Sequence, residues 1–358
     1  MSTLVWIGFC QSFFAAILMF TKKNNSMADR ILSGWLMLLA IDFLSCALNY
    51  QFFDRPLLIS SFLLFNPALY LYICSLTKIE FKLRWFQLLH LFPFLFFGIY
   101  TYILKLPFSL DTFFVKDQNY IFRIFFASAN IVSWLVYNPL SLILVHKYRM
   151  HLRHELSNIE KNENIGWVLV VAIFYVVYCI IAYLITVVAY FDVLNPLTPH
   201  FYNYVSLLVL VYIMSFYGLR QKEVSKHLLL PETSVPYKNS SLTSEMKENI
   251  KEKIIIYFEK ENAYLNPDLN MSMVSKAIKV PKYQITEVLN TEIGKNFFQF
   301  ANMYRIEAVK KMLSNSNNKF SIEAIGYECG FSSKSSFFTV FKNMTGKTPV
   351  SYRQSLSE

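Results

Sequence analysis

The stretch SIEAIGYECGFSSKSSFFTVFKNMTGKTPVSYR, Ser321–Arg353, decides the fold of the C-terminal part of the chain. Apolar residues recur at helical spacing from Ile322 to Cys329, which predicts a short helix. Gly330 offers the backbone freedom for a turn, and Ser333–Asn343 predicts a second helix. This order of elements is that of a helix-turn-helix.

The second helix of this stretch has one apolar and one polar face. Phe337, Val340 and Phe341 follow the i, i+3, i+4 spacing of a buried face. The polar residues are left at the N-terminal end and on the outer face, from which a recognition helix reaches base edges in the major groove of DNA. Two flanking lysines suit phosphate contacts. The predicted DNA-binding residues are Ser333, Lys334, Ser335, Ser336, Thr339, Lys342 and Lys347.

An internal repeat predicts a second helix-turn-helix. A shift of 52 residues aligns Lys282 with Lys334 and Gly294 with Gly346. The earlier copy runs from Val274 through a turn at Lys279 and Val280 to a helix at Pro281–Asn290. Its candidates for outward-facing DNA contacts are Lys282, Tyr283, Gln284, Thr286 and Glu287.

A helical run, Asn296–Asn315, lies between the two copies. Nineteen or so residues at 1.5 Å each make a rod of about 28 Å. Successive major-groove faces lie about 34 Å apart, so such a rod could hold two readers one turn of DNA apart. The sequence therefore predicts recognition of a bipartite site by one chain.

Residues 245–353 resemble the DNA-binding domain of AraC/XylS-type transcription regulators. The residues that carry the resemblance are Gly294, Phe297, Phe300, Asn302, Arg305, Ile306, Ala308, Ile322, Ile325, Gly330, Phe331, Ser333, Ser335, Phe337, Phe341, Lys342, Gly346, Pro349, Tyr352 and Arg353. Gly326 departs from the family's usual Ala, and Glu287 stands where a basic or amide residue is commoner. The resemblance implies sequence-specific binding of promoter DNA, and Arg305 is expected to anchor the connecting helix.

The N-terminal part has the composition of a membrane protein. Residues 1–219 hold 14 Lys and Arg and 10 Asp and Glu, whereas the shorter segment 220–358 holds 20 and 14. A transmembrane helix needs about 20 mostly apolar residues. Seven stretches meet this requirement: Thr3–Phe20, Ile31–Phe53, Leu57–Leu76, Phe86–Leu104, Ile121–Val145, Ile165–Phe191 and Phe201–Leu219. The predicted fold is all-α, a seven-helix transmembrane bundle followed by two helix-turn-helix units on a long linker helix.

The distribution of basic residues predicts the orientation of the spans. With the N-terminus outside, the loops on the inner side hold ten Lys and Arg and the outer loops hold three. The first apolar run has no basic residues before it, unlike a cleaved signal peptide. We therefore expect a multi-pass protein of the inner, cytoplasmic membrane, with the C-terminal domain in the cytoplasm.

Asp42 is the candidate for a functional site within the membrane, since an ionisable group at mid-bilayer is costly. A carboxyl group that pairs with a neighbouring helix is the alternative. The five cysteines form no CxxC pair, and there is no catalytic His/Glu cluster, nucleophile elbow or phosphate loop. The sequence predicts no metal site, no cofactor and no enzymatic activity.

Three segments follow from these patterns: a membrane domain at residues 1–219, a Pro- and Ser-containing linker at 220–243 and a DNA-binding domain at 244–358. They predict a membrane-embedded one-component transcription regulator, controlled by a signal that the membrane domain senses. Its expected partners are double-stranded promoter DNA, the lipid bilayer, an unknown signal ligand and a second copy in a homodimer. The alternatives are a transporter whose DNA-binding tail is autoregulatory, or a membrane anchor from which proteolysis releases that tail.

Overall fold

The computed structural model describes residues 2–23, 25–48, 62–78, 81–104, 116–159, 166–190, 198–221, 242–315 and 319–356. Within these ranges the secondary structure is helical, apart from an isolated β-bridge between Leu156 and Asn270. The all-α prediction is confirmed for this part of the chain. The Pro- and Ser-containing linker lies almost entirely outside the described residues.

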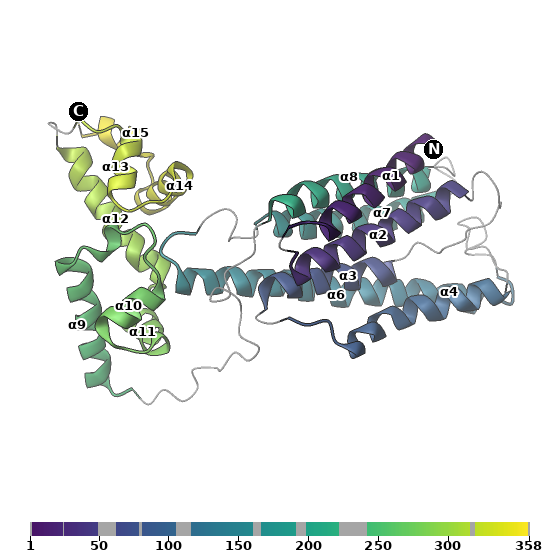
Figure 1. Cartoon of the computed structure of the whole chain (residues 1–358), viewed down its shortest axis with the longest axis horizontal. Helices are drawn as coiled ribbons and strands as arrows, with labels where there is room; N and C mark the ends of the chain where they lie inside the picture. Colours follow the sequence, from purple (N-terminus) through teal and green to yellow (C-terminus); the bar gives the residue numbers. More distant parts are fainter. Residues whose placement is uncertain are drawn as a thin grey trace. The chain divides into compact units, whose positions relative to one another are not determined.

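A helix occupies each of the seven predicted apolar stretches (Figure 1). The helices are α1 (Ser2–Phe20), α2 (Met27–Leu48), α3 (Phe62–Thr77), α4 (Phe92–Leu104, preceded by the 3-10 turn η2, Trp85–Leu91), α6 (Tyr120–Glu155), α7 (Gly166–Tyr190) and α8 (Thr198–Arg220).

Five helices among the described residues are long and apolar enough to cross a membrane, namely those in α1, α2, α6, α7 and α8. The other two predicted spans are shorter helices here. The described part of α3 has 16 residues. The stretch that ends in α4 starts as a 3-10 turn and becomes α-helical only at Phe92, next to Pro93, which has no N–H to donate. Seven spans thus remain a prediction.

Small residues let the apolar helices approach closely. Helix α1 packs against α2 and α8, and α7 packs against α8. A Cβ atom on Gly8 of α1 would meet the Phe43 ring of α2 at 2.3 Å, and one on Gly218 of α8 would meet Leu32 at 2.4 Å. Side chains of one helix thus pack directly onto the backbone of the next at these glycines, and small residues at such interfaces are typical of helices that associate in a bilayer.

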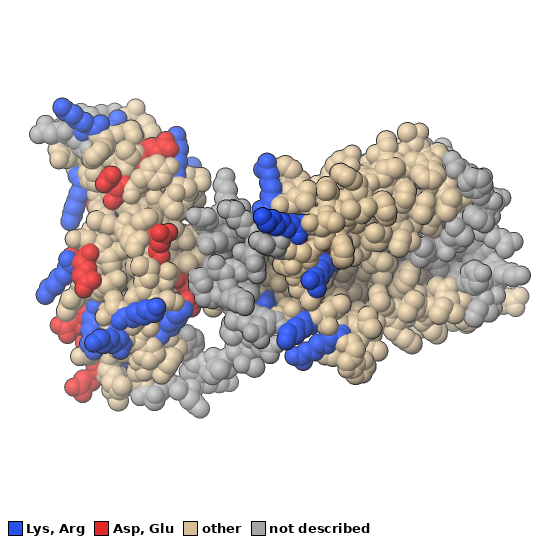
Figure 2. Space-filling model, in the orientation of Figure 1, with Lys and Arg blue, Asp and Glu red and all other residues tan. Residues whose placement is uncertain are grey.

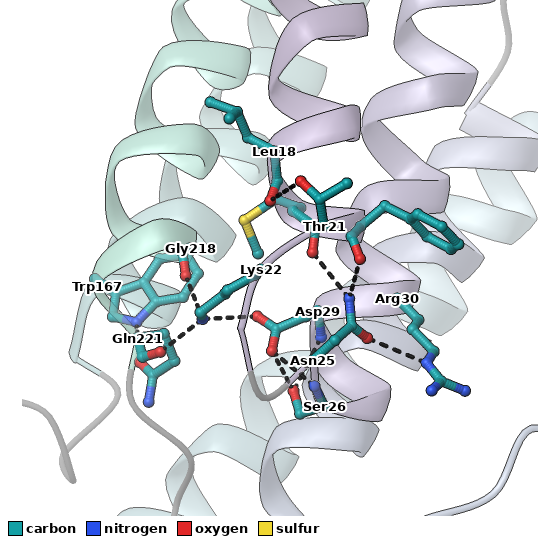
Figure 3. A network of polar contacts seen from close by, with 12 residues as sticks. Leu18, Thr21, Lys22, Asn25, Ser26, Asp29, Arg30, Trp167, Gly218 and Gln221 are labelled. Carbon is teal, nitrogen blue, oxygen red and sulfur yellow. Dashed lines mark hydrogen bonds and ion pairs between the residues drawn. The ribbon is translucent and has the colours of Figure 1, made fainter.

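A polar network closes one end of this bundle (Figure 3). The Lys22 ammonium group pairs with Asp29 at 2.9 Å and donates to the carbonyl oxygens of Gly218 at 3.2 Å and Gln221 at 2.8 Å. The Trp167 indole donates to the Gln221 side chain at 2.7 Å. The turn between α1 and α2 is thereby joined to the end of α8 and the start of α7.

The C-terminal helices form two small cores on one shared helix. They are α9 (Ser244–Lys260), α10 (Met271–Ile278), α11 (Lys282–Val288), α12 (Phe297–Ser314), α13 (Ile322–Glu328), α14 (Lys334–Thr345) and α15 (Pro349–Gln354), with the short turns η4 (Ala263–Leu265) and η5 (Leu289–Ile293). Thr243 is the N-cap of α9, and its side chain accepts a hydrogen bond from the Met246 N–H. Figure 1 shows α9, α10 and α11 at one end of α12 and α13, α14 and α15 at the other.

Each end of α12 belongs to a different core. Phe297, Phe300 and Ala301 pack with the buried residues of α9, α10 and α11. Ile306 and Val309 pack with those of α13 and α14. Helix α12 therefore holds the two cores together, as the sequence predicts for the linker helix.

The chain divides into two compact parts by internal contacts. The N-terminal part comprises residues 1–146 and 165–231, and the C-terminal part comprises 147–164 and 232–358. The C-terminal part thus includes a segment that directly follows the apolar portion of α6.

Candidate DNA-binding interface

The second helix-turn-helix consists of α13, a tight turn and α14. Ser321 caps α13 and Ser333 caps α14, each accepting a hydrogen bond from the backbone three residues on. Between the helices Gly330 adopts a φ of 88°, which is accessible to glycine at little cost. Phe331 is buried against Phe337 and fills the corner between the two helices.

The polar face of α14 is accessible. Phe337, Val340 and Phe341 are buried, as their spacing predicts. Of the seven predicted contact residues, Lys334, Ser335, Thr339, Lys342 and Lys347 are exposed, while Ser333 and Ser336 are half-buried. Lys334 pairs with Glu323 of α13 at 3.0 Å, and both side chains are largely exposed. Such a surface pair contributes little to stability, so its lysine is available to DNA.

Gly326 has a packing role that the sequence did not indicate. A Cβ atom at this position of α13 would meet Cδ1 of the Phe337 ring at 2.5 Å. Glycine lowers helix propensity, but here it makes room for an aromatic side chain of the recognition helix. Glycine in place of the family's usual Ala therefore allows α13 and α14 to pack closely at this position.

The first helix-turn-helix repeats this geometry with one difference. Helix α10 is capped by Asn270, and α11 begins at Lys282, as α14 begins at Lys334. The turn residue is Lys279, which adopts a φ of 54° without being a glycine. Both copies end on a glycine of positive φ, Gly294 and Gly346. The repeat in the sequence is thus a repeat in the backbone.

The five candidates on α11 differ in exposure. Tyr283 is 58% exposed, and Lys282 and Gln284 are half-buried. Thr286 and Glu287 are 9% and 7% exposed, so the outward orientation predicted for them is wrong. The Thr286 hydroxyl donates to the Lys282 carbonyl oxygen within the helix.

Glu287 is buried because α9 supplies a cation. Its carboxylate lies 3.1 Å from the ammonium group of Lys247, which also approaches Glu292 at 3.7 Å. A buried carboxylate needs a cation or hydrogen-bond donors nearby. The sequence of α11 alone does not indicate this partner, because Lys247 lies 40 residues earlier in the chain. Glu287 therefore joins α9 to α11.

Arg305 anchors α12, in agreement with the expectation for a structural residue. It is fully buried, and burial lowers the pKa of its guanidinium group to about 9. Nε donates to the Tyr264 carbonyl oxygen at 2.8 Å, and Nη2 donates to that of Asn266 at 3.0 Å. The Phe331 ring lies 5.8 Å from the guanidinium carbon. Arg305 thus connects α12 to the segment before α10 and to the turn of the second helix-turn-helix.

The surface of this part carries both signs of charge. Residues 241–358 have 16 Lys and Arg against 12 Asp and Glu. Figure 2 shows acidic and basic side chains interspersed on the visible face of the helix-turn-helix region. Affinity for DNA therefore depends on the position of a few lysines more than on net charge.

Asp42, the candidate in the N-terminal part, is 7% exposed and lies within the interior face of α2. Buried neighbours on the same helix include Leu39, Phe43 and Cys46. Its location agrees with the rule that ionisable groups in membrane helices face the bundle interior.

Comparison with known proteins identifies the C-terminal region. Residues 274–355 match the family described as a helix-turn-helix domain, and they are an AraC-type DNA-binding domain. The predicted resemblance is confirmed. The apolar N-terminal region matches no recognised family.

The similar curated proteins match a limited part of this chain. An uncharacterized HTH-type transcriptional regulator in the cgkA 5′ region of Pseudoalteromonas carrageenovora is 28% identical over 158 residues, 40% of this chain and 90% of that protein. An uncharacterized HTH-type transcriptional regulator of Staphylococcus aureus is 29% identical over 33% of this chain and 15% of that protein. The regulatory protein PocR of Salmonella typhimurium is 29% identical over 27% of this chain and 31% of that protein.

Proposed function

We propose that this AraC-type transcription regulator is embedded in a membrane and binds promoter DNA under the control of a signal sensed by its N-terminal helices. The observation that carries the proposal is the presence, in one chain, of an AraC-type domain and five helices long and apolar enough to cross a bilayer. A chain of this kind must reach the chromosome while it is held at a membrane surface.

The proposed topology has seven spans, an outside N-terminus and a cytoplasmic C-terminal domain. Basic residues support it. Lys22, Lys23, Arg30 and Arg220 lie at the end of α1, the start of α2 and the end of α8. On the visible face of the N-terminal part, Figure 2 shows Lys and Arg at one end and no charged side chains over the rest of the described surface. Large hydrophobic side chains of α1, α6 and α7 are exposed. A basic end next to an apolar band is typical of the cytoplasmic side of a membrane protein.

The second helix-turn-helix is the proposed main reader. Ser335, Thr339 and Lys334 project from the exposed face of α14 and are placed to contact base edges. Lys342 and Lys347 are placed to contact phosphates, which fix the register on the duplex. In the first helix-turn-helix, Tyr283 and Gln284 remain accessible for the same purpose, whereas the Lys282 ammonium group pairs with Glu155 at 2.8 Å.

The length of α12 supports recognition of a bipartite site. Its 18 residues make a rod of about 27 Å, compared with about 34 Å for one turn of DNA. The signal ligand would act on the bundle interior, where Asp42 is the proposed polar contact. Homodimerisation is the proposed route to longer operators.

Selection of DNA sites by the full chain tests this function. The protein is reconstituted in lipid nanodiscs, incubated with random duplexes, and the retained DNA is sequenced and footprinted. We expect a motif with two parts whose centres lie about 10 base pairs apart. Retention of DNA without sequence preference would contradict the proposal.

A further inference from the structure

The end of α6 leads directly into the DNA-binding region. Helix α6 is continuous from Tyr120 to Glu155, and residues 147–164 belong to the C-terminal part. Leu156 forms a β-bridge with Asn270, the N-cap of α10. Glu155 pairs with Lys282 of α11 at 2.8 Å. A segment more than 100 residues away in sequence is therefore attached to the first helix-turn-helix.

Ser157 is bound through both its backbone and its side chain. Its N–H and its hydroxyl donate to the Leu269 carbonyl oxygen at 3.2 and 2.5 Å. Its carbonyl oxygen accepts from Asn302 at 3.1 Å and from Nη1 of Arg305 at 2.9 Å. Its hydroxyl oxygen also accepts from Nη2 of Arg305 at 2.8 Å. Ser157 is completely buried.

Asn158 connects the two ends of the domain. Its amide nitrogen donates to the Pro267 carbonyl oxygen at 2.7 Å and to the Gly330 carbonyl oxygen at 2.9 Å. Pro267 lies in the segment before α10, and Gly330 is the turn of the second helix-turn-helix. One side chain thus contacts the segment that precedes the first helix-turn-helix and the turn of the second.

The buried guanidinium group of Arg305 depends on Ser157 for two of its hydrogen-bond acceptors. Two of its four described hydrogen bonds end on Ser157, and the other two end on backbone carbonyl oxygens. A buried guanidinium group that loses acceptors leaves unsatisfied donors, which is costly in an apolar interior. The contacts that hold the two cores together at Arg305 therefore include Ser157, which lies outside the matched residues 274–355.

We infer that Ser157 and Asn158 are positioning residues for DNA recognition, which fix the two helix-turn-helix units at the spacing of a bipartite site. The inference rests on the proposed function. Because α6 ends two residues before Ser157, a displacement of this helix would move Ser157 and Asn158 and change their contacts with the two cores. A signal that moves α6 thereby changes the spacing of the two readers and the affinity for the full operator.

The variant Asn158→Ala tests this role in the full chain in nanodiscs. Binding is measured on the selected two-part operator and on a duplex that keeps only the half-site of the second helix-turn-helix. We expect affinity for the full operator to fall about tenfold and half-site affinity to stay within about twofold. The control is Ser314→Ala, whose hydroxyl donates to the Lys310 carbonyl oxygen of its own helix and to no other described residue, and it should change neither affinity.

Two results on these duplexes would overturn the inference. Wild-type affinity of Asn158→Ala for the full operator would show that the spacing does not depend on this side chain. Equal losses on both duplexes would show a contribution to folding of the whole domain instead. Failure of the wild-type chain to select any site is a different outcome, because it rejects the proposed function itself.

Hydrogen–deuterium exchange on the unmodified full chain provides a measurement without substitution. The Ser157 amide, which donates to Leu269, should exchange slowly with operator DNA bound. Exchange at the rate of unstructured chain would overturn the inference, since the segment would not be docked when DNA is read.

Discussion

Gly330 combines a positive φ with a close backbone contact. A Cβ atom there would meet the Tyr264 carbonyl oxygen at 2.3 Å, so both the conformation and the space exclude a side chain. Gly346 has a similar φ of 76° but open space around it. Substitutions at these two glycines therefore measure separately the cost of the strained backbone conformation and the cost of overpacking.

Gly330→Ala is expected to destabilise the C-terminal domain by about 3 kcal/mol or more, since strain and overpacking add. Gly346→Ala should cost only about 1 kcal/mol, from the backbone alone. Hydrogen exchange of α12 amides measures both effects in the full chain. Equal costs at the two positions would contradict the described contact between Gly330 and Tyr264.

Gly326→Ala is expected to destabilise the domain by about 1 kcal/mol, although alanine is the better helix former. The reason is the 2.5 Å approach to the Phe337 ring. In a Phe337→Leu background the smaller side chain leaves room for the new methyl group. The penalty of Gly326→Ala should then shrink or reverse in a double-mutant cycle, and an unchanged penalty would argue against this packing.

Lys342 of α14 and Lys347, which follows the end of this helix at Thr345, are the proposed phosphate contacts of this element. Lys342→Ala and Lys347→Ala should each weaken binding about equally on all DNA sequences. Each should also reduce the slope of log affinity against log salt by about 1. Lys310→Ala on α12 is the control, because this lysine pairs with Glu307 on its own helix. A change in sequence preference with an unchanged salt slope would assign base contacts to these lysines instead.

Local patterns predicted the elements better than the contacts between them. The helices of both helix-turn-helix units follow from apolar spacing and turn residues, so α10 to α14 lie where the sequence places them. Thr286 and Glu287 fit an outward face by local spacing, yet α9 packs over Glu287 with a cation at Lys247. The docking of Ser157 depends on partners up to 148 residues away, which no local pattern reveals.

The same limit applies to the apolar helices. Hydropathy located each apolar helix that the structure describes in the N-terminal part, because an apolar stretch is a property of neighbouring residues. The contact of Gly8 with Phe43 and the hydrogen bonds of Lys22 join residues far apart in the sequence, so hydropathy could not predict them. Burial of Asp42 could be expected from its cost in a bilayer, whereas its neighbours could not.

For the whole molecule, the proposed function combines DNA recognition with attachment to a membrane. In this proposal the AraC-type domain contains the readers and the apolar helices attach the chain to the bilayer, while α6 has residues in both compact parts. A soluble regulator needs only the first of these. Intact attachment during DNA binding is therefore the claim that separates this account from release of the domain by proteolysis.

Chromatin immunoprecipitation of the chromosomally tagged full-length chain, with fractionation of the same cells, tests this claim most directly. If the chain binds DNA while attached to the membrane, we expect sharp peaks upstream of a few genes and an intact chain in the membrane fraction. The peaks should be lost in a Lys342→Ala, Lys347→Ala double variant. Absence of peaks with the chain intact in the membrane would contradict this claim. So would peaks that arise only from a fragment carrying the C-terminal domain.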